Sequence, residues 1–111
     1  MDVSFVDGRL ARECNSSARL RARWGDLWTS VARRLLQIAA AARVADLALL
    51  PYAQLSGAQE PGTYDVTFGE GIMIRLVAVD DNGNPVATEA GGASVVEIQI
   101  VSISAARKKA A

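Results

Sequence analysis

Residues 55–79 read LSGAQEPGTYDVTFGEGIMIRLVAV, and this stretch decides the fold. From Thr63 to Phe68 apolar and polar side chains alternate, which is typical of a strand with one buried face. A Gly-Glu-Gly turn follows and supplies the positive φ angles that a tight hairpin needs. The next run predicts a second strand, in which the single cation Arg75 stands among apolar neighbours. A charge in such a strand is costly to bury unless it is paired or faces a site.

The flanking sequence predicts helices before this hairpin and one more strand after it. We expect a short strand over residues 3–6, a short helix that ends at Cys14, a long helix from Ser17 to about Arg43 with a candidate kink at Gly25, a loop over residues 80–94 and a last strand from Ser94 to Ser104. Alternation along the last strand places Val96, Ile98, Ile100 and Ser102 on one face and Val95, Glu97, Gln99, Val101 and Ile103 on the other.

The predicted fold class is α+β. It is a small antiparallel sheet with two to three N-terminal helices packed on one face, and the other sheet face stays partly open. Residues 1–104 form a single domain in this interpretation, and residues 105–111 form a basic tail.

The long predicted helix carries an apolar stripe at steps of three and four residues. Its members are Trp24, Leu27, Trp28, Val31, Leu35, Ile38 and Ala42. This pattern places Arg33 and Arg34 off the stripe. We interpret the two tryptophans as core residues or partner-facing anchors rather than base-stacking platforms, because they share the stripe with aliphatic side chains.

The net charge of zero hides a strong asymmetry along the chain. Residues 1–45 hold eight arginines and four acids, whereas residues 46–104 hold eight acids and one cation. A polyanion such as RNA would therefore have to contact the basic half or the tail. The candidate RNA-binding residues are Arg33, Arg34, Arg107, Lys108 and Lys109. The alternative is that the arginines only solvate helix faces.

The composition excludes several classes of site. The chain has no histidine, which rules out a Ser-His-Asp triad and a histidine metal site, and we expect no metal and no cofactor. Its one cysteine, Cys14, predicts a small buried residue on a helix and fits a reducing compartment. No apolar run approaches the length of a bilayer span, and the first residues lack the features of a signal peptide. We therefore expect a cytoplasmic protein with no membrane partner.

Several short motifs, weak one by one, match a known family in combination. They are the Val3-Ser4-Phe5 start, the short helix ending at Cys14, Trp24-Gly25 at the opening of the long helix, Asp46-Leu47 before a proline, Leu55-x-Gly57, Gly62-x-Tyr64, Ile74-Arg75-Leu76 and a final Val-x-Ile strand. With the order of the predicted elements, they resemble the RelE/ParE superfamily of bacterial toxins. The resemblance is strongest to its HigB branch, the plasmid-maintenance killer proteins.

This resemblance implies the toxin component of a type II toxin–antitoxin system. Members of the HigB branch are mRNA endonucleases, or mRNA interferases, that act on the translating ribosome. Each is neutralised by an antitoxin, usually a small helix-turn-helix protein. The implied partners are therefore a cognate helix-turn-helix antitoxin and, for the activity, the ribosome and mRNA. The implied catalytic residue is Arg75, which in the family would face the scissile phosphate and stabilise the transition state.

The remaining reactive positions of the family are not retained here. Ala53 stands where the family pattern has a histidine, and Ser56 where it has a lysine. Ser102 and Ser104 occupy the acidic and histidine positions of the closing motif, and Gln59-Glu60-Pro61-Gly62 replaces a basic loop. Alanine and serine do not transfer protons near neutral pH, so we expect weak or no ribonuclease activity.

Two other functions and two roles for Arg75 stay open on the sequence. The chain could be a ParE-like toxin that acts by binding a non-RNA target such as gyrase, or a non-enzymatic α+β interaction module. Arg75 could be a residual phosphate-binding residue, or it could form a structural ion pair with Asp65 or Glu97 on an adjacent strand.

Overall fold

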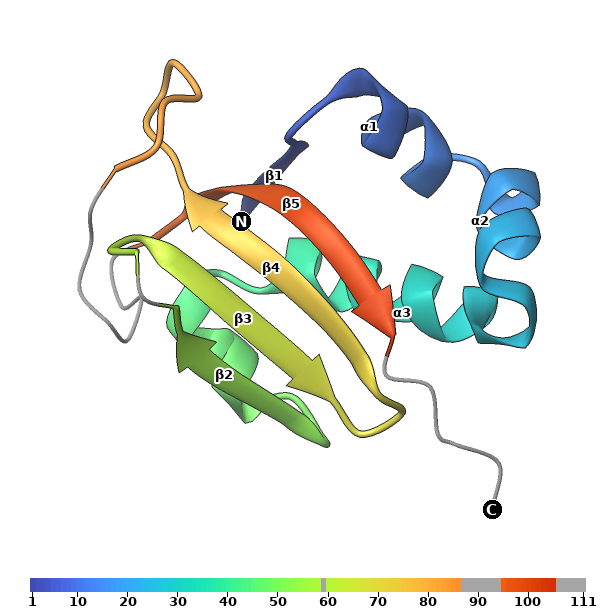
Figure 1. Ribbon diagram of the computed structural model, residues 1–111. Helices are drawn as coiled ribbons and strands as arrows, with labels where there is room; N and C mark the ends of the chain where they lie inside the picture. Colours follow the sequence, from blue (N-terminus) through green and yellow to red (C-terminus); the bar gives the residue numbers. More distant parts are fainter. Residues whose placement is uncertain (59, 87–94, 106–111) are drawn as a thin grey trace.

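A five-stranded sheet forms the centre of the protein in a computed structural model that describes residues 1–58, 60–86 and 95–105 (Figure 1). The elements in chain order are β1 (Asp2–Phe5), α1 (Gly8–Cys14), α2 (Ser17–Trp24), the 3-10 helix η1 (Gly25–Leu27), α3 (Trp28–Ala40), the 3-10 helix η2 (Val44–Leu49), β2 (Ala53–Gly57), β3 (Thr63–Phe68), β4 (Ile72–Ala78) and β5 (Glu97–Ala105). The predicted α+β class is confirmed. The last strand reaches Ala105, one residue into the predicted tail, whose residues 106–111 lie outside the described part.

The strand order is β1-β5-β4-β3-β2, and the sheet is mixed. Strands β3 to β5 form the expected antiparallel meander, with β3 and β4 joined by the predicted hairpin, and β2 pairs antiparallel with β3 as an additional strand. The prediction of an antiparallel sheet is wrong for one pair, because β1 runs parallel to β5. The sequence pattern predicts a loop from Leu55 up to Thr63, and this prediction is wrong for residues 55–57, which belong to β2.

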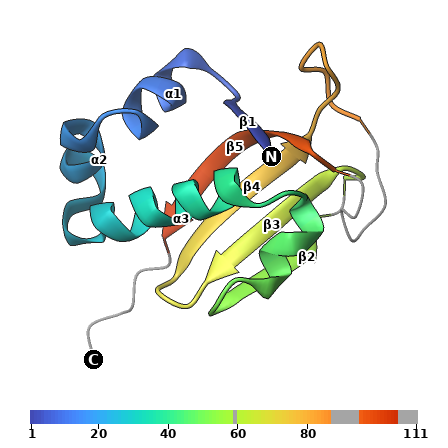
Figure 2. The same cartoon turned by 180° about the vertical axis from the view of Figure 1, so that it is seen from behind.

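One face of the sheet carries the core. The buried apolar side chains of the sheet come from β3, β4 and β5: Tyr64, Val66, Phe68, Ile72, Ile74, Leu76, Ala78, Ile98, Ile100 and Ile103. Val31 and Ile38 of α3 and Val44 and Leu47 of η2 belong to the same buried cluster. Figure 2 shows α3 crossing the sheet on this side, with α1 and α2 out beyond the β1–β5 edge. No helix of the described part of the chain covers the opposite face, as expected (Figure 1 and Figure 2).

The predicted long helix is divided at Gly25. Gly25 ends α2 with φ 57° and ψ −129°, and its N–H donates to the carbonyl oxygen of Arg21. This pair of angles is rare for residues with a Cβ atom, so glycine allows the chain to leave one helix and enter the next. Gly25 was a candidate kink on the sequence, and the structure shows a complete break.

A register shift in β5 changes which of its side chains are buried. Arg75 is paired with Ser102, whereas Leu76 is paired with Ile100, so Val101 is an extra residue in β5. Such a bulge reverses the alternation beyond it. Ile103 is therefore buried and Ser102 is exposed, and the prediction that placed Ser102 with Ile100 and Ile103 on the opposite face is wrong.

Among the described residues, no helix combines the length and the apolar character that crossing a bilayer requires.

Candidate functional site

The open face of the sheet brings together most of the positions that the family resemblance singled out. Ser56 is paired with Asp65, Asp65 with Arg75, and Arg75 with Ser102, so these four residues form one row across β2, β3, β4 and β5. We call them the cross-strand row. Ser104 is paired with Met73 in the neighbouring row, and Ala53 at the start of β2 is paired with Phe68. If one of these strands were shifted by one residue against its neighbour, its side chain in the row would lie on the other face of the sheet.

Arg75 is held by Asp65 through two hydrogen bonds. Its Nε donates to Oδ1 at 2.8 Å and its terminal nitrogen to Oδ2 at 3.0 Å. The hydrogen bond and the charge of Asp65 raise the pKa of Arg75 above its ordinary value. The side chain of Arg75 is 44% exposed and that of Asp65 is 16% exposed. Of the two ion-pair partners considered on the sequence, the structure selects Asp65, and Arg75 is not buried.

A shallow hollow of about 520 Å³ lies beside the cross-strand row. Its lining includes Gly57 at the end of β2, Glu60 after it, and Thr63, Asp65, Arg75 and Val101. Two carboxylates and one guanidinium face this space, and the guanidinium is already paired. A phosphate group would have to compete with Asp65 for Arg75, so the electrostatics of the hollow favour neutral or cationic groups.

Neither serine of the row supplies an acid or a base. The Ser56 hydroxyl donates weakly to the backbone carbonyl oxygen of Asp65 at 3.5 Å, and Ser102 is exposed. Proton transfer during attack on a phosphodiester needs groups that titrate near the working pH. The cross-strand row therefore has one cation for electrostatic stabilisation and no proton-transfer pair.

The end of the sheet nearest the start of β5 is acidic. Glu97 of β5 is paired in register with Asp2 of β1 and lies near Asp80 and Asp81. A hydrogen bond with Asp81 raises the pKa of Glu97 above its ordinary value, and loss of solvent and the nearby negative charges add to the effect. Within residues 1–58, 60–86 and 95–105, no set of three or more acidic, cysteine or histidine side chains is arranged to hold a metal ion.

This cluster makes stability depend on pH in a defined direction. The folded state binds the Glu97 proton more tightly than the unfolded state, so Glu97 lowers stability as pH rises above about 4.5. Glu97→Gln should therefore raise the Tm at pH 7 and have little effect at pH 4. Thermal unfolding at both pH values checks this. Asp26→Asn, which neutralises an exposed acid in the basic half, is the control and should not reproduce the pattern.

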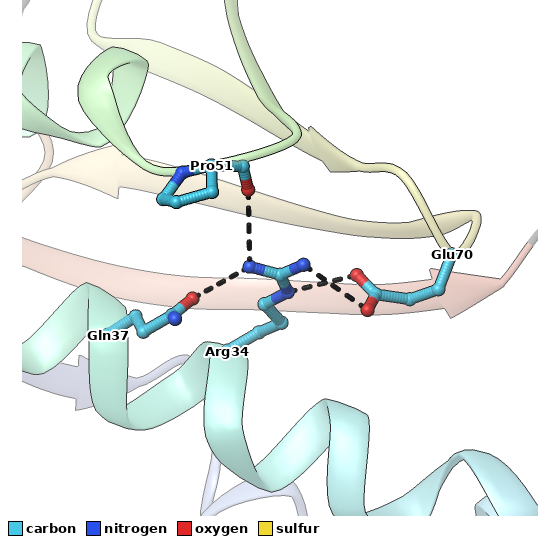
Figure 3. Close-up of polar contacts among 4 residues, drawn as sticks. All are labelled: Arg34, Gln37, Pro51 and Glu70. Atoms are coloured by element: carbon cyan, nitrogen blue, oxygen red, sulfur yellow. Dashed lines mark hydrogen bonds and ion pairs between the residues drawn. The ribbon is translucent and has the colours of Figure 1, made fainter.

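Arg34 is buried between α3 and the sheet, unlike Arg33, the neighbouring candidate for RNA binding (Figure 3). It donates to both carboxylate oxygens of Glu70, at 2.9 and 3.2 Å, to the side chain of Gln37 at 2.9 Å and to the carbonyl oxygen of Pro51 at 3.5 Å. Its guanidinium carbon is 4.4 Å from the ring centroid of Phe68. Arg34 thus connects α3, the β3–β4 turn and the segment before β2.

The prediction that Arg34 lies off the buried stripe of the helix is wrong. It is 7% exposed and shares the inner side of α3 with Val31 and Ile38. The signal was available in the spacing, because residues 31, 34 and 38 recur at steps of three and four. A guanidinium held by Glu70 in this way is not free to contact a phosphate. Arg33, the next residue back, is exposed and stays a candidate for RNA binding. Arg107, Lys108 and Lys109 lie outside the described residues.

An apolar groove of about 440 Å³ lies on the helical side of the molecule. Its lining includes Val3 and Phe5 of β1, Leu20 of α2, and Trp28, Leu35 and Leu36 of α3. Leu36 is 72% exposed. Trp24 and Trp28 are half-buried against the core, and each ring is covered by an arginine, Arg23 and Arg21 respectively.

Cys14 also lines this groove and is not a nucleophile. Burial raises the pKa of its thiol to about 11, and the negative charge of Glu13 acts in the same direction. The thiol is therefore protonated near neutral pH. Cys14 is the last residue of α1, as predicted, but it is partly rather than fully buried.

Comparisons of this chain with protein-family models, with curated proteins and with solved structures gave no significant match.

Proposed function

We propose that this protein is the toxin-like component of a bacterial type II toxin–antitoxin pair, and that it acts by binding a target rather than by cutting mRNA. The observation that carries the second half of this proposal is the double hydrogen bond between Arg75 and Asp65. Among the described residues, Arg75 is the cation on the open sheet face, and the neighbouring carboxylate of Asp65 neutralises it. The serines beside it do not supply general acid–base chemistry.

Support for the first half comes from the sequence motifs and from the order of the elements. A strand, a helical segment and an antiparallel meander follow one another as the RelE/ParE resemblance implies. The open face of the sheet carries Arg75 and two of the positions, Ser56 and Ser102, where the family has reactive residues. The proposal places this chain in the cytoplasm, where its single free cysteine would remain reduced.

The proposed partner is a cognate helix-turn-helix antitoxin that contacts the helical side and a sheet edge. The apolar groove between β1, α2 and α3 supports this assignment, because its lining is mostly apolar and Leu36 stands exposed beside it. An apolar stripe on a partner helix would bury both the groove and the Leu36 side chain. Arginines of α2, among them Arg19 and Arg21, are exposed and would attract an acidic partner segment.

Ribosome-dependent mRNA cleavage is the second candidate function. The observation in its favour is that Arg75 is 44% exposed beside a hollow, where a phosphate could reach it if Asp65 moved away. In that case plasmid maintenance through an mRNA interferase would be the biological role, and the ribosome would have to supply the proton-transfer groups.

Two assays on the complete chain separate these functions. Expression in bacterial cells, with and without co-expression of the proposed antitoxin, measures growth arrest and its relief. Incubation of the purified protein with translating ribosomes, followed by mapping of mRNA ends, measures cleavage. We expect arrest that the antitoxin relieves and no cleavage. Robust cleavage would overturn the binding mechanism, and the absence of arrest under strong expression would overturn the toxin assignment.

Removing the carboxylate that neutralises Arg75 should expose its charge to RNA. Asp65→Asn keeps the size of the side chain and leaves Arg75 without its ionic partner. We expect the affinity for a single-stranded RNA to rise about tenfold, because a charge-assisted hydrogen bond to phosphate becomes available. Fluorescence anisotropy at fixed salt checks this. The double variant Asp65→Asn/Arg75→Ala should return to the wild-type affinity, and an equal gain in it would show that Arg75 is not responsible.

A further inference from the structure

The outer edge of β2 has no charged side chain, no proline and no bulge, which are three common features that protect an edge strand. Residues 53–57 read AQLSG and contain neither a charge nor a proline. β2 ends the strand order on this side, and among the described residues it is paired with β3 alone. The opposite edge differs, because β1 carries Asp2 and the amino group of Met1 is bonded to the carbonyl oxygen of Ala41 at 2.7 Å. Unprotected edges are templates for pairing with another strand.

The backbone groups on this edge can be assigned from the antiparallel pairing. Ala58 N–H donates to the carbonyl oxygen of Thr63 at 3.0 Å, so residue 58 faces β3. Because direction alternates along a strand, Ser56 and Gln54 also face β3, and Leu55 and Gly57 face outward. Ala53 faces outward too, but its N–H already donates to the carbonyl oxygen of Leu50 at 3.2 Å. Among the described residues, the outward backbone groups without a partner are therefore the Ala53 carbonyl and the N–H and carbonyl groups of Leu55 and Gly57.

This set of groups is self-complementary about a two-fold axis at Leu55. Two antiparallel copies of β2 would place Leu55 opposite Leu55, with two N–H to C=O bonds between them. Each Gly57 N–H would donate to an Ala53 carbonyl of the other copy, and the occupied Ala53 N–H would not be needed. Four hydrogen bonds result. A closed isologous contact of this kind ends the sheet extension after two copies.

The side chains fit the same arrangement. Gln54 would lie opposite Ser56, so no like charges meet across the two-fold. The segment that leads into β2 also exposes two large apolar side chains, Leu49 at 81% and Tyr52 at 84%. Tyr52 is the one described non-glycine residue with a positive φ, 59°, which fixes how the chain enters the strand. We propose that β2 is a homodimer edge, at which two copies of this chain join their sheets into one of ten strands.

Sedimentation equilibrium and amide hydrogen exchange on the complete chain test this proposal. We expect a monomer–dimer equilibrium between about 1 µM and 1 mM, and exchange at the Leu55 and Gly57 amides that slows as concentration rises. Gln54→Lys brings two cations close together across the axis. Gly57→Pro removes an outward N–H, and Gly57 does not have a positive φ that proline would exclude. Each variant should weaken the dimer at least tenfold.

The matched control is Thr67→Lys, which adds the same charge on the same face one strand inward. It should leave the dimer affinity unchanged. A wild-type chain that stays monomeric over this range would overturn the proposal, as would a dimer that both edge variants retain. Protection of the two amides that appears only after an antitoxin is added would assign the edge to that partner instead. None of these results depends on toxicity, so the proposed function is tested separately.

Discussion

Replacing Arg34 by alanine should lower the free energy of unfolding by about 2–4 kcal/mol, the largest effect we expect from any polar residue of this chain. The change leaves the Glu70 carboxylate, which is 23% exposed, without its cation and removes a stacked group from the face of Phe68. Removing one partner of a buried ion pair costs more free energy than the pair contributes, because the other charge is left buried without a partner. Glu70 keeps some exposure to solvent, so we expect the loss of unfolding free energy to stay below the upper end of the range for fully buried pairs. Chemical denaturation at pH 7 measures it.

Arg33→Ala is the control for this experiment, because Arg33 is the exposed neighbour on the same helix. It should change the free energy of unfolding by less than about 0.5 kcal/mol. The loss of unfolding free energy caused by Arg34→Lys should lie between those of Arg33→Ala and Arg34→Ala. Lysine keeps the positive charge but lacks the forked guanidinium that contacts both carboxylate oxygens of Glu70. In a double-mutant cycle with Glu70→Ala, the coupling should be about 1–3 kcal/mol. Equal effects of Arg33→Ala and Arg34→Ala would contradict this account.

Gly25→Ala should lower the free energy of unfolding by about 1–3 kcal/mol through backbone strain alone. A Cβ atom at Gly25 would meet nothing within 4 Å, so no steric clash contributes. The cost comes from φ 57° and ψ −129°, which an alanine rarely adopts. We expect the loss to appear as a lower denaturation midpoint with an unchanged slope.

Gly8→Ala provides the comparison for Gly25→Ala. Gly8 opens α1 without a positive φ, and its Cβ would make an ordinary contact of 3.6 Å with the Arg12 side chain. It should be neutral or stabilising by up to about 1 kcal/mol. If Gly25→Ala were equally neutral, the break between α2 and α3 would not depend on glycine, and the chain would adopt another conformation there.

Local sequence patterns predict one part of the candidate site and not another. Alternation predicted that Arg75 and Asp65 lie on the same open face of a hairpin, and both do. It did not choose between Asp65 and Glu97 as the partner of Arg75, because that choice depends on the register between strands and on the bulge at Val101. The same bulge places Ser102, rather than Val101, beside Arg75. A shift of one residue is invisible in the hydrophobic pattern when the extra residue is itself apolar.

The amino-acid sequence by itself determined the order of the elements apart from β2, the β3–β4 hairpin, the open sheet face and the glycine at which the helical segment is divided. These features depend on periods of two and 3.6 residues and on backbone angles that glycine favours, which are properties of neighbouring residues. The tertiary structure decided the parallel pairing of β1 with β5, the recruitment of residues 53–57 into the sheet, the pairing of Arg75 with Asp65, and the burial of Arg34 against Glu70 and Phe68. Each of these joins segments far apart in the chain, so its free energy depends on contacts that no local pattern contains.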